Sequence, residues 1–479
     1  MPRKKQPKAA AFFDLDRTIV RGASGAIYAD ELREVGVLPS RRNPAEPVLF
    51  KIFDIFGENW PSMMATRQGV RLTNGWDRAK VIQAAEAATT RLLEQVLPYA
   101  RIEMAEHRAA GRAVVLATTT PLDWVTPLAR EMGFDEIIAT QYHHEGGRYT
   151  GNVDGRYIWG RGKSQQVQEW ALENNIDLAE SYAYSDSYYD VPLLSIVGHP
   201  NAVNPDPRLA VIAALRRWPT RFLDAPPGVP KLAGLEPQQV AFLLARPEMM
   251  PFVRTRIFSS SRIPASGSAI IVANHRSYFD PLAIGFALAK RGRPVRFLGK
   301  KEVFDAPLVG DFAKAMGGIR VDRGTGSDAP LRAAEEALAA GEMVAMMPQG
   351  TIPRGREFFN PELKGRWGVA RLAHATGAPV IPMGLWGTEL VWPRSSRFPN
   401  VTNVLHPPKV TVSVGRPVAL EYDSLEADTE RIMDAIVGLL PAVAREWHEP
   451  TDEEIARATP ANASAIDDDS EAERRPGTV

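Results

Sequence analysis

The chain has 479 residues, which is too long for one ordinary hydrophobic core, so two or three domains are expected. Its 57 basic and 57 acidic residues balance, and this gives no electrostatic reason to expect a nucleic-acid partner. The absence of cysteine excludes disulfides, thiolate metal sites and a cysteine nucleophile, so any nucleophile must be oxygen or nitrogen.

The chain starts with a basic stretch, residues 1–8, which we expect to be solvated and disordered. Contact of these charges with anionic lipid is the alternative. No run of 18 or more apolar residues follows, so we expect no helix that spans a bilayer.

Three predicted strands in the first half end in polar side chains. The strands are the apolar runs 9–13, 113–117 and 182–185. Asp14 and Asp16 follow the first, Thr118 follows the second, and Asp186 and Asp190 follow the third. In open α/β sheets, ligands bind at the carboxyl ends of the strands, so these side chains are expected to face one site.

Lys163 opens a helix-like segment, residues 164–173, between the second and third of these strands. Carboxylates suit Mg²⁺, and a lysine with hydroxyl donors suits a phosphoryl group. Taken singly, each motif could be turn or helix-cap chemistry. The ordered set of four favours a magnesium and phosphate site.

With these motifs in order, residues 9–222 resemble the haloacid dehalogenase superfamily of phosphohydrolases. The resemblance implies a Rossmann-like α/β domain that hydrolyses a small phosphomonoester. Asp14 would attack phosphorus to form an aspartyl-phosphate, and Asp16 would protonate the leaving oxygen and later activate water. Thr118 and Lys163 would bind the phosphoryl oxygens. The implied magnesium ligands are Asp14, Asp16 through its carbonyl, Asp186 and Asp190.

Residues 22–111 between the first two motifs are predicted to be mainly helical, for instance over 76–96. They occupy the position of the helical cap in the phosphoserine-phosphatase-like branch of that superfamily, and a cap closes the site against water. Arg17 stands before Thr18, where the phosphoserine enzymes of that branch usually carry a serine. This departure argues against phosphoserine as the substrate.

A proline-rich linker, residues 223–237, leads to a second domain, which we place at 238–448. Its first stretch, 238–258, is amphipathic and suits either burial or a lipid interface. Strand-like runs then alternate with helix-like runs, which predicts an α/β domain with its own core. The strand-like runs are 269–273, 295–298, 318–321, 343–347, 380–383 and 410–414, and the helix-like ones include 330–340 and 429–447.

The turn after the first of these strands carries His275 and Asp280. In a continuous helix, side chains five positions apart would lie about 140° apart and could not meet. They can meet if His275 closes the strand and Asp280, followed by Pro281, caps the next helix. A carboxylate that fixes the tautomer of an imidazole is what general-base activation of a hydroxyl requires.

Residues 238–448 resemble the glycerolipid acyltransferases, the lysophosphatidic acid acyltransferases and their relatives. The signature is Asn274-His275 with Asp280 five positions after the histidine. Three further stretches match the other blocks of the family in order and spacing: residues 317–323, 348–351 and 380–382.

The resemblance implies that His275, oriented by Asp280, deprotonates an acceptor hydroxyl as it attacks acyl-CoA. Arg323 would bind the phosphate of a lysophospholipid such as 1-acylglycerol-3-phosphate, and two residues, Gly350 and Thr351, would line that pocket. The third block departs from the usual Glu-Gly-Thr-Arg, with Gln349 for the Glu and Ile352 for the Arg. Arg354 and Arg356 are the candidates for the missing cation.

Trp392, Arg394 and Arg397 follow the fourth block, and the sequence leaves open whether they form an interfacial rim or ordinary surface. Residues 449–479 carry nine acidic and three basic residues and little to bury, so we expect a disordered tail. The expected protein is a fused phosphatase and acyltransferase, peripheral on the cytoplasmic face of the membrane or cytoplasmic. The alternatives are a phosphatase with a catalytically dead lipid-binding module and a phosphatase that the second domain only anchors.

Overall fold

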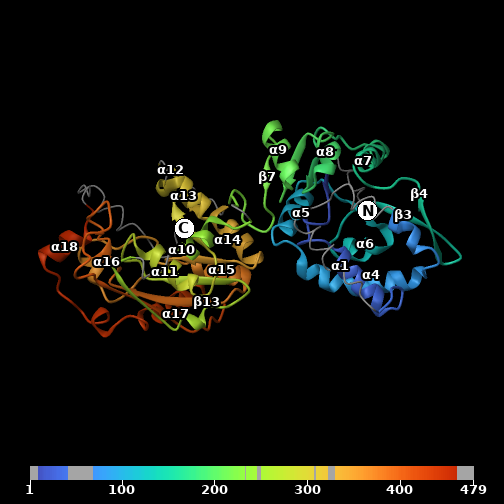
Figure 1. Cartoon of the computed structure of the whole chain (residues 1–479). Helices are drawn as coiled ribbons and strands as arrows, with labels where there is room; N and C mark the ends of the chain where they lie inside the picture. Colours follow the sequence, from blue (N-terminus) through green and yellow to red (C-terminus); the bar gives the residue numbers. More distant parts are fainter. Residues whose placement is uncertain are drawn as a thin grey trace. The chain divides into compact units, whose positions relative to one another are not determined.

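The computed structural model describes residues 9–40, 68–231, 234–244, 250–306, 309–321 and 329–460. The chain forms two compact units, Met1–Pro227 and Gly228–Val479 (Figure 1). Each unit is built on one seven-stranded, mainly parallel sheet with helices packed against it, which confirms the prediction of two α/β domains. The predicted features that lie wholly or partly outside the described residues are the basic start, part of the helical cap, parts of the linker and of the amphipathic stretch 238–258, Arg323 and the end of the acidic tail.

The sheet of the first unit has the order β4-β3-β2-β1-β5-β6-β7, and only β3 and β4 are antiparallel neighbours. β1 lies between β2 and β5, so the chain leaves the central strand in both directions and a crevice forms at the carboxyl ends. The strands are β1 (Ala10–Phe13), β2 (Ala113–Pro121), β3 (Glu136–Glu145), β4 (Arg148–Asp154), β5 (Tyr182–Ser185), β6 (His199–Val203) and β7 (Thr220–Arg221).

A helical layer with its own apolar cluster accompanies this sheet. α4 begins after Asp77, whose side chain accepts hydrogen bonds from the backbone of Ala79 and Lys80, and it packs on α1 and α6. Side chains from α1, α4 and the β3–β4 hairpin are buried together there. The described helices are α1 (Gly25–Glu34), α4 (Arg78–Gln95), α5 (Ala100–Ala109), α6 (Leu122–Glu131), α7 (Arg161–Glu173), α8 (Val191–Leu194) and α9 (Pro207–Arg216).

The sheet of the second unit has the order β11-β10-β12-β9-β13-β14-β8, with β13 and β14 as its antiparallel pair. The strands are β8 (Arg254–Phe258), β9 (Ala269–Ala273), β10 (Val295–Lys300), β11 (Ile319–Val321), β12 (Met343–Met346), β13 (Val380–Trp386) and β14 (Lys409–Val414). The helices are α10 (Pro237–Leu244), α11 (Asp280–Ala289), α12 (Lys301–Asp305), α13 (Val309–Ala315), α14 (Ala329–Ala339), α15 (Gly368–Thr376), α16 (Thr388–Val391), α17 (Leu425–Val437) and α18 (Asp452–Ala458).

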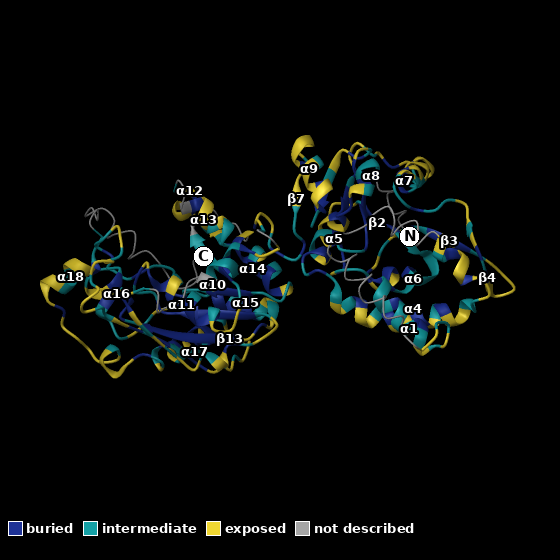
Figure 2. Ribbon diagram, viewed as in Figure 1, coloured by how far each residue is buried: buried dark blue, intermediate teal, exposed yellow. Residues whose placement is uncertain are grey.

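The central strand β9 is buried on both faces, as its uninterrupted apolar sequence requires. Ile271 and Ala273 belong to one core cluster, with α11, and Ile270 and Val272 to another, with α14, α15 and α17. Figure 2 shows the strands of this sheet as buried between exposed helix faces. The turn that follows β9 therefore starts from a strand whose side chains are buried on both faces of the sheet.

The predicted disorder of residues 449–479 is wrong for residues 452–458, which form α18. Thr451 and Glu454 make a capping box that satisfies the first backbone N–H groups of this helix. Ala458 is buried with Ile352 and Phe358. Among the described residues, no helix is long and apolar enough to cross a membrane.

Asp428 of α17 joins three segments through one buried carboxylate. It accepts hydrogen bonds from His374 of α15, from the backbone of Glu421 and Tyr422, and from Arg431. Burial opposes ionisation, but these donors outweigh it and lower the pKa of Asp428 from 3.8 to about 2. The carboxylate thus stabilises the fold fully above the ordinary carboxyl pKa, and this contribution is lost as the pH falls towards 2.

We predict that Asp428→Asn makes the backbone amides of Glu421 and Tyr422 exchange hydrogen about tenfold faster at neutral pH, because the charged acceptor is lost. Hydrogen exchange followed by mass spectrometry measures this. Asp434→Asn, at an exposed position of the same helix, is the control and should leave the exchange unchanged. Equal exchange in both variants would contradict the assigned role of Asp428.

Candidate active sites

In the first unit, a buried lysine joins two of the predicted carboxylates. The Lys163 Nζ lies 2.8 Å from Asp14 Oδ1 and 2.7 Å from Asp190 Oδ2. Ser185 Oγ donates a second hydrogen bond to Asp190 Oδ2, at 2.7 Å. Asp14 and Ser185 lie at the carboxyl ends of the paired strands β1 and β5, so these side chains meet at the edge of the sheet where open α/β folds bind ligands.

Arg17 and Thr18, which follow β1, contact both the backbone and the side chain of Asp186. Its backbone N–H donates to Thr18 Oγ1 at 3.1 Å, and its Oδ2 lies 3.2 Å from Arg17 Nε. Asp16 Oδ1 accepts a 2.6 Å hydrogen bond from the backbone of Ser24. In the sequence, Arg17 was notable only because it stands where the phosphoserine enzymes usually carry a serine. In the structure it adds a positive charge beside Asp186, a predicted metal ligand.

Thr118 lies in the C-terminal part of β2, almost fully buried, where its Oγ1 accepts a hydrogen bond from the backbone of Thr120 at 3.2 Å. Because β2 pairs in parallel with β1, this hydroxyl lies at the same edge of the sheet as Asp14. The predicted phosphatase residues therefore come from neighbouring strand ends, and Lys163 comes from the start of α7.

No group of three or more histidine and carboxylate side chains in the described ranges is arranged to hold a metal. Asp190, predicted as a ligand, is instead engaged by Lys163 and Ser185, while its Oδ1 is buried with no hydrogen-bond partner in the described part of the chain. Asp14 and Asp186 still provide two hard oxygen donors on adjacent strands. These donors fit the chemistry of Mg²⁺.

We predict that Lys163→Met destabilises the first unit by about 3–5 kcal/mol, because two buried carboxylates would lose their shared cation. Denaturant unfolding of the full chain, with hydrogen exchange of β1 and β5 to locate the loss, measures this. The double variant K163M/D190N should recover part of the stability. An unchanged unfolding midpoint in K163M would contradict the assigned ion pairs.

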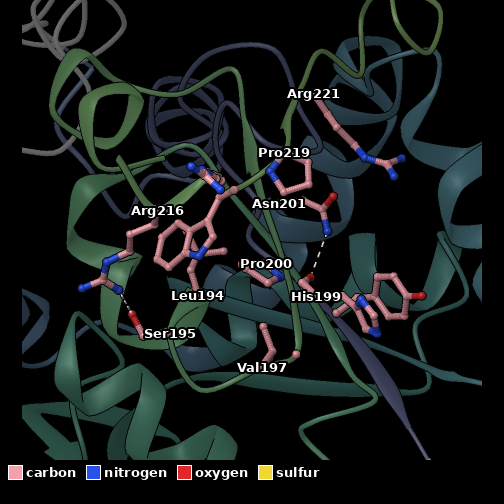
Figure 3. Close-up of a pocket in the computed structure, with 13 residues that line it drawn as sticks. Leu194, Ser195, Val197, His199, Pro200, Asn201, Arg216, Pro219 and Arg221 are labelled. Atoms are coloured by element: carbon pink, nitrogen blue, oxygen red, sulfur yellow. Dashed lines mark hydrogen bonds between the residues drawn. The ribbon is translucent and has the colours of Figure 1, made fainter. Parts of the chain in front are cut away.

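A separate cavity of about 630 Å³ lies at the opposite end of this sheet. Tyr182 and His199, the first residues of β5 and β6, line it with stacked rings 4.4 Å apart. Arg216 lines it from the end of α9 (Figure 3). Trp218, two residues further along the chain, lines it as well. Since Asp14 and Asp186 follow the last residues of their strands, this cavity is not the predicted phosphatase site.

In the second unit, a fully buried carboxylate fixes the predicted histidine. Asp280 Oδ2 lies 2.8 Å from His275 Nδ1. The same oxygen accepts hydrogen bonds from the backbone of Arg276 at 2.7 Å and of Ser277 at 2.8 Å. With the Nδ1 proton donated to the carboxylate, the lone pair of the imidazole lies on Nε2, where it can accept a proton.

Two neighbouring strands hold the turn in place. Asn274 bonds Leu385 of β13 through both side-chain atoms, donating to its carbonyl at 2.9 Å and accepting from its N–H at 2.7 Å. The backbone N–H of His275 donates to Gln349 Oε1, after β12, at 2.7 Å. β12 and β13 flank β9, so the three central strands converge on the histidine.

Arg276 is a residue of this site that sequence reasoning missed. Its guanidinium lies between the rings of Phe358 and Trp386, 4.4 and 4.3 Å from their centroids. It also pairs with Glu389 at 3.0 Å. The sequence places Arg276 beside His275, but only the fold brings the two rings to it from distant segments.

The prediction for the turn is wrong in one detail. Asp280 is the first residue of α11 and not its cap, because its carboxylate bonds the preceding backbone instead of the following turn. In the third block, Gln349, which replaces the usual Glu, bonds the backbone of His275. Ile352, in place of the usual arginine, is a buried packing residue.

The predicted acceptor residues are only partly described, since Arg323 lies outside the described residues. Gly350 has a φ of +72°, and a Cβ there would lie 3.1 Å from the Arg366 guanidinium. Arg366 N donates to the carbonyl of Pro348. Arg356, one candidate for the missing cation, pairs with Glu449, and Arg366 lies against Gly350 of this block.

Comparisons with known proteins divide the chain in the same way. The haloacid dehalogenase-like hydrolase family matches residues 11–195, and the acyltransferase family matches residues 254–386. A probable phosphatase of Mycobacterium tuberculosis is 35% identical over 226 residues, which make up 46% of this chain and 77% of that protein. A phosphoserine phosphatase of the same organism is 31% identical over 44% of this chain and 70% of its own length.

Among solved structures, the chain is similar to the 1-acyl-sn-glycerophosphate acyltransferase of Thermotoga maritima, with 24% identity and a TM-score of 0.29, over 41% of this chain and 75% of that one. The chain belongs to the haloacid dehalogenase-like hydrolases through its N-terminal unit, to which an acyltransferase domain is fused. The fusion predicted from the sequence is confirmed.

Proposed function

We propose that the C-terminal domain transfers an acyl group from acyl-CoA to a hydroxyl of a lysophospholipid such as 1-acylglycerol-3-phosphate. The observation that carries this proposal is the hydrogen bond of His275 Nδ1 to the buried carboxylate of Asp280. His275 is itself partly exposed, with 19% of its side chain accessible, so a substrate can reach the ring.

In the proposed reaction, His275 Nε2 takes the proton of the acceptor hydroxyl as its oxygen attacks the thioester carbonyl. The C–O bond forms, the C–S bond breaks, and the proton passes from the imidazolium to the leaving thiolate of coenzyme A. Asp280 keeps the ring in one orientation and stabilises the imidazolium that forms. No acyl-enzyme is needed.

The acceptor phosphate is proposed to bind at the third block. Gly350 and Thr351 would line this pocket and Arg323 would bind the phosphate through its guanidinium fork. Arg366, which lies against Gly350, is a further cation at this edge and stands in for the arginine that Ile352 replaces.

For the N-terminal phosphatase domain, we propose that Asp14 is the nucleophile and Asp16 the acid and base. Lys163 holds Asp14 and Asp190 in position and neutralises phosphoryl charge, and Thr118 donates to a phosphoryl oxygen. Mg²⁺, when bound, supplies positive charge to the transferring phosphoryl group. Asp14, the Asp16 carbonyl and Asp186 would hold it, with Asp190 acting through Lys163.

The two domains are proposed to act on intermediates of phospholipid synthesis, with the protein peripheral on the cytoplasmic face of the membrane or in the cytoplasm. The fusion itself supports this proposal, since one chain carries a phosphomonoester hydrolase and an acyltransferase.

A reciprocal pair of variants tests both sites. His275→Ala should reduce acyl transfer to 1-acylglycerol-3-phosphate by about a hundredfold to ten-thousandfold and leave hydrolysis of a phosphomonoester such as p-nitrophenyl phosphate intact. Asp14→Asn should do the reverse. Transfer that is unchanged in His275→Ala would favour the alternative of a phosphatase with a catalytically dead lipid-binding module.

Gln349→Ala separates a positioning role from a role in binding the acceptor. Because Gln349 bonds the backbone of His275, its loss should lower kcat about tenfold and change KM for the acceptor little. Steady-state kinetics with varied lysolipid measure both constants. A raised KM with unchanged kcat would instead indicate that Gln349 binds the acceptor and would contradict the positioning role.

A further inference from the structure

A loop beside the acyltransferase site exposes large apolar side chains. We call residues 398–405 the apolar loop. Phe398 is 76% exposed and Leu405 is 83% exposed, and Val401 and Val404 are about half exposed. Single exposed apolar residues are ordinary, but several within eight residues of sequence mark an interaction surface.

The loop is ordered by its own polar groups. Ser396 Oγ donates to the carbonyl of Phe398 at 2.7 Å, and Asn400 N donates to the carbonyl of Val391 at 2.8 Å. Thr402 Oγ1 donates to Asn400 Oδ1 at 2.9 Å. The backbone is thus fixed by hydrogen bonds while the apolar side chains point into solvent, so the surface is built before any partner arrives.

The segment that leads into the apolar loop contacts the turn that carries His275. Ser277 Oγ donates to the carbonyl of Trp392 at 2.6 Å, and the ring of Tyr278 lies 5.7 Å from the Trp392 indole. Trp392 Nε1 in turn donates to the carbonyl of Ser396, two residues before the apolar loop, at 3.2 Å. Tyr278, three residues after His275, is itself about half exposed.

The charges on either side of the apolar loop indicate what kind of partner the loop binds. Residues 390–420 contain no aspartate or glutamate, and three of their basic side chains are exposed, Arg397, Lys409 and Arg416, whereas Arg394 is buried and donates to the carbonyl of Pro353. Arg397 and Lys409 are exposed at either side of the apolar loop. Apolar side chains flanked by basic ones suit an interface of acyl chains beneath anionic headgroups.

We propose that the apolar loop docks the acyltransferase domain on the surface of an anionic phospholipid bilayer, with Phe398 and Leu405 inserted between the lipids. The purpose of this docking rests on the proposed function: a lipid acceptor held in the bilayer reaches His275 without leaving the membrane. The docking itself does not depend on catalysis.

Flotation of the full chain with phosphatidylcholine vesicles, with and without phosphatidylglycerol, tests this inference. The double variant Phe398→Ser with Leu405→Ser should bind the anionic vesicles at least about tenfold more weakly. Leu172→Ser, at an equally exposed apolar position of the first unit, is the control and should bind as the wild type does. Added salt should weaken wild-type binding.

The same proteins are then assayed with a vesicle-borne lysolipid and with a water-soluble short-chain acceptor. The double variant should lose transfer to the first and keep transfer to the second. The docking role would be overturned if the double variant bound the vesicles as the wild type does. It would also be overturned if the double variant changed only its oligomeric state in light scattering and not its vesicle binding. Loop-dependent vesicle binding with no transfer to either acceptor by the wild type would instead overturn the proposed function.

Discussion

The acyltransferase site depends on the buried carboxylate of Asp280. Among the described residues, its side chain contacts no arginine guanidinium and no lysine ammonium group. His275 and two backbone N–H groups donate to one oxygen of the Asp280 carboxylate, and these hydrogen bonds offset the hydration that the side chain loses on burial. These hydrogen bonds hold residues 274–280 in a tight turn. The turn brings the imidazole of His275 to the edge of the sheet. Removing any one donor would leave the charge less well satisfied, so the turn and the catalytic orientation of the ring are one structural unit.

A pair of a histidine and a buried aspartate occurs a second time, through the other ring nitrogen. His374 Nε2 lies 2.7 Å from Asp428 Oδ2, and this carboxylate also accepts two backbone N–H groups, one on each oxygen. That pair joins α15 to α17, and it has an additional donor in Arg431. What distinguishes His275 is its surroundings: Asn274 bonds β13, and Gln349, which follows β12, bonds the backbone of His275. A histidine paired with a buried aspartate can therefore serve to join two helices, as His374 does, and the catalytic role proposed for His275 rests on where the fold places it.

Much of this was predictable because the strands that carry the sites are short, fully apolar runs bounded by polar motifs. β1, β2 and β5 and the central strands of the second sheet follow directly from such runs. The strands β3, β4, β6, β7 and β8, which lie at the edges of the sheets or next to them, were not predicted, since exposed polar residues interrupt their apolar signal. The positions of Arg276, Gln349 and Arg366 depend on contacts between segments far apart in sequence, which no local pattern encodes. Their roles became visible only with the fold, as did the packing role of Ile352.

The most direct test of the account is the rate of acyl transfer by Asp280→Asn, measured with acyl-CoA and 1-acylglycerol-3-phosphate alongside the wild type. Asparagine keeps the size of the side chain but removes the charge that orients the ring and stabilises the imidazolium. The account predicts that kcat falls by about a hundredfold or more while the protein remains folded and its phosphatase activity persists. Wild-type transfer by a folded Asp280→Asn protein would contradict it.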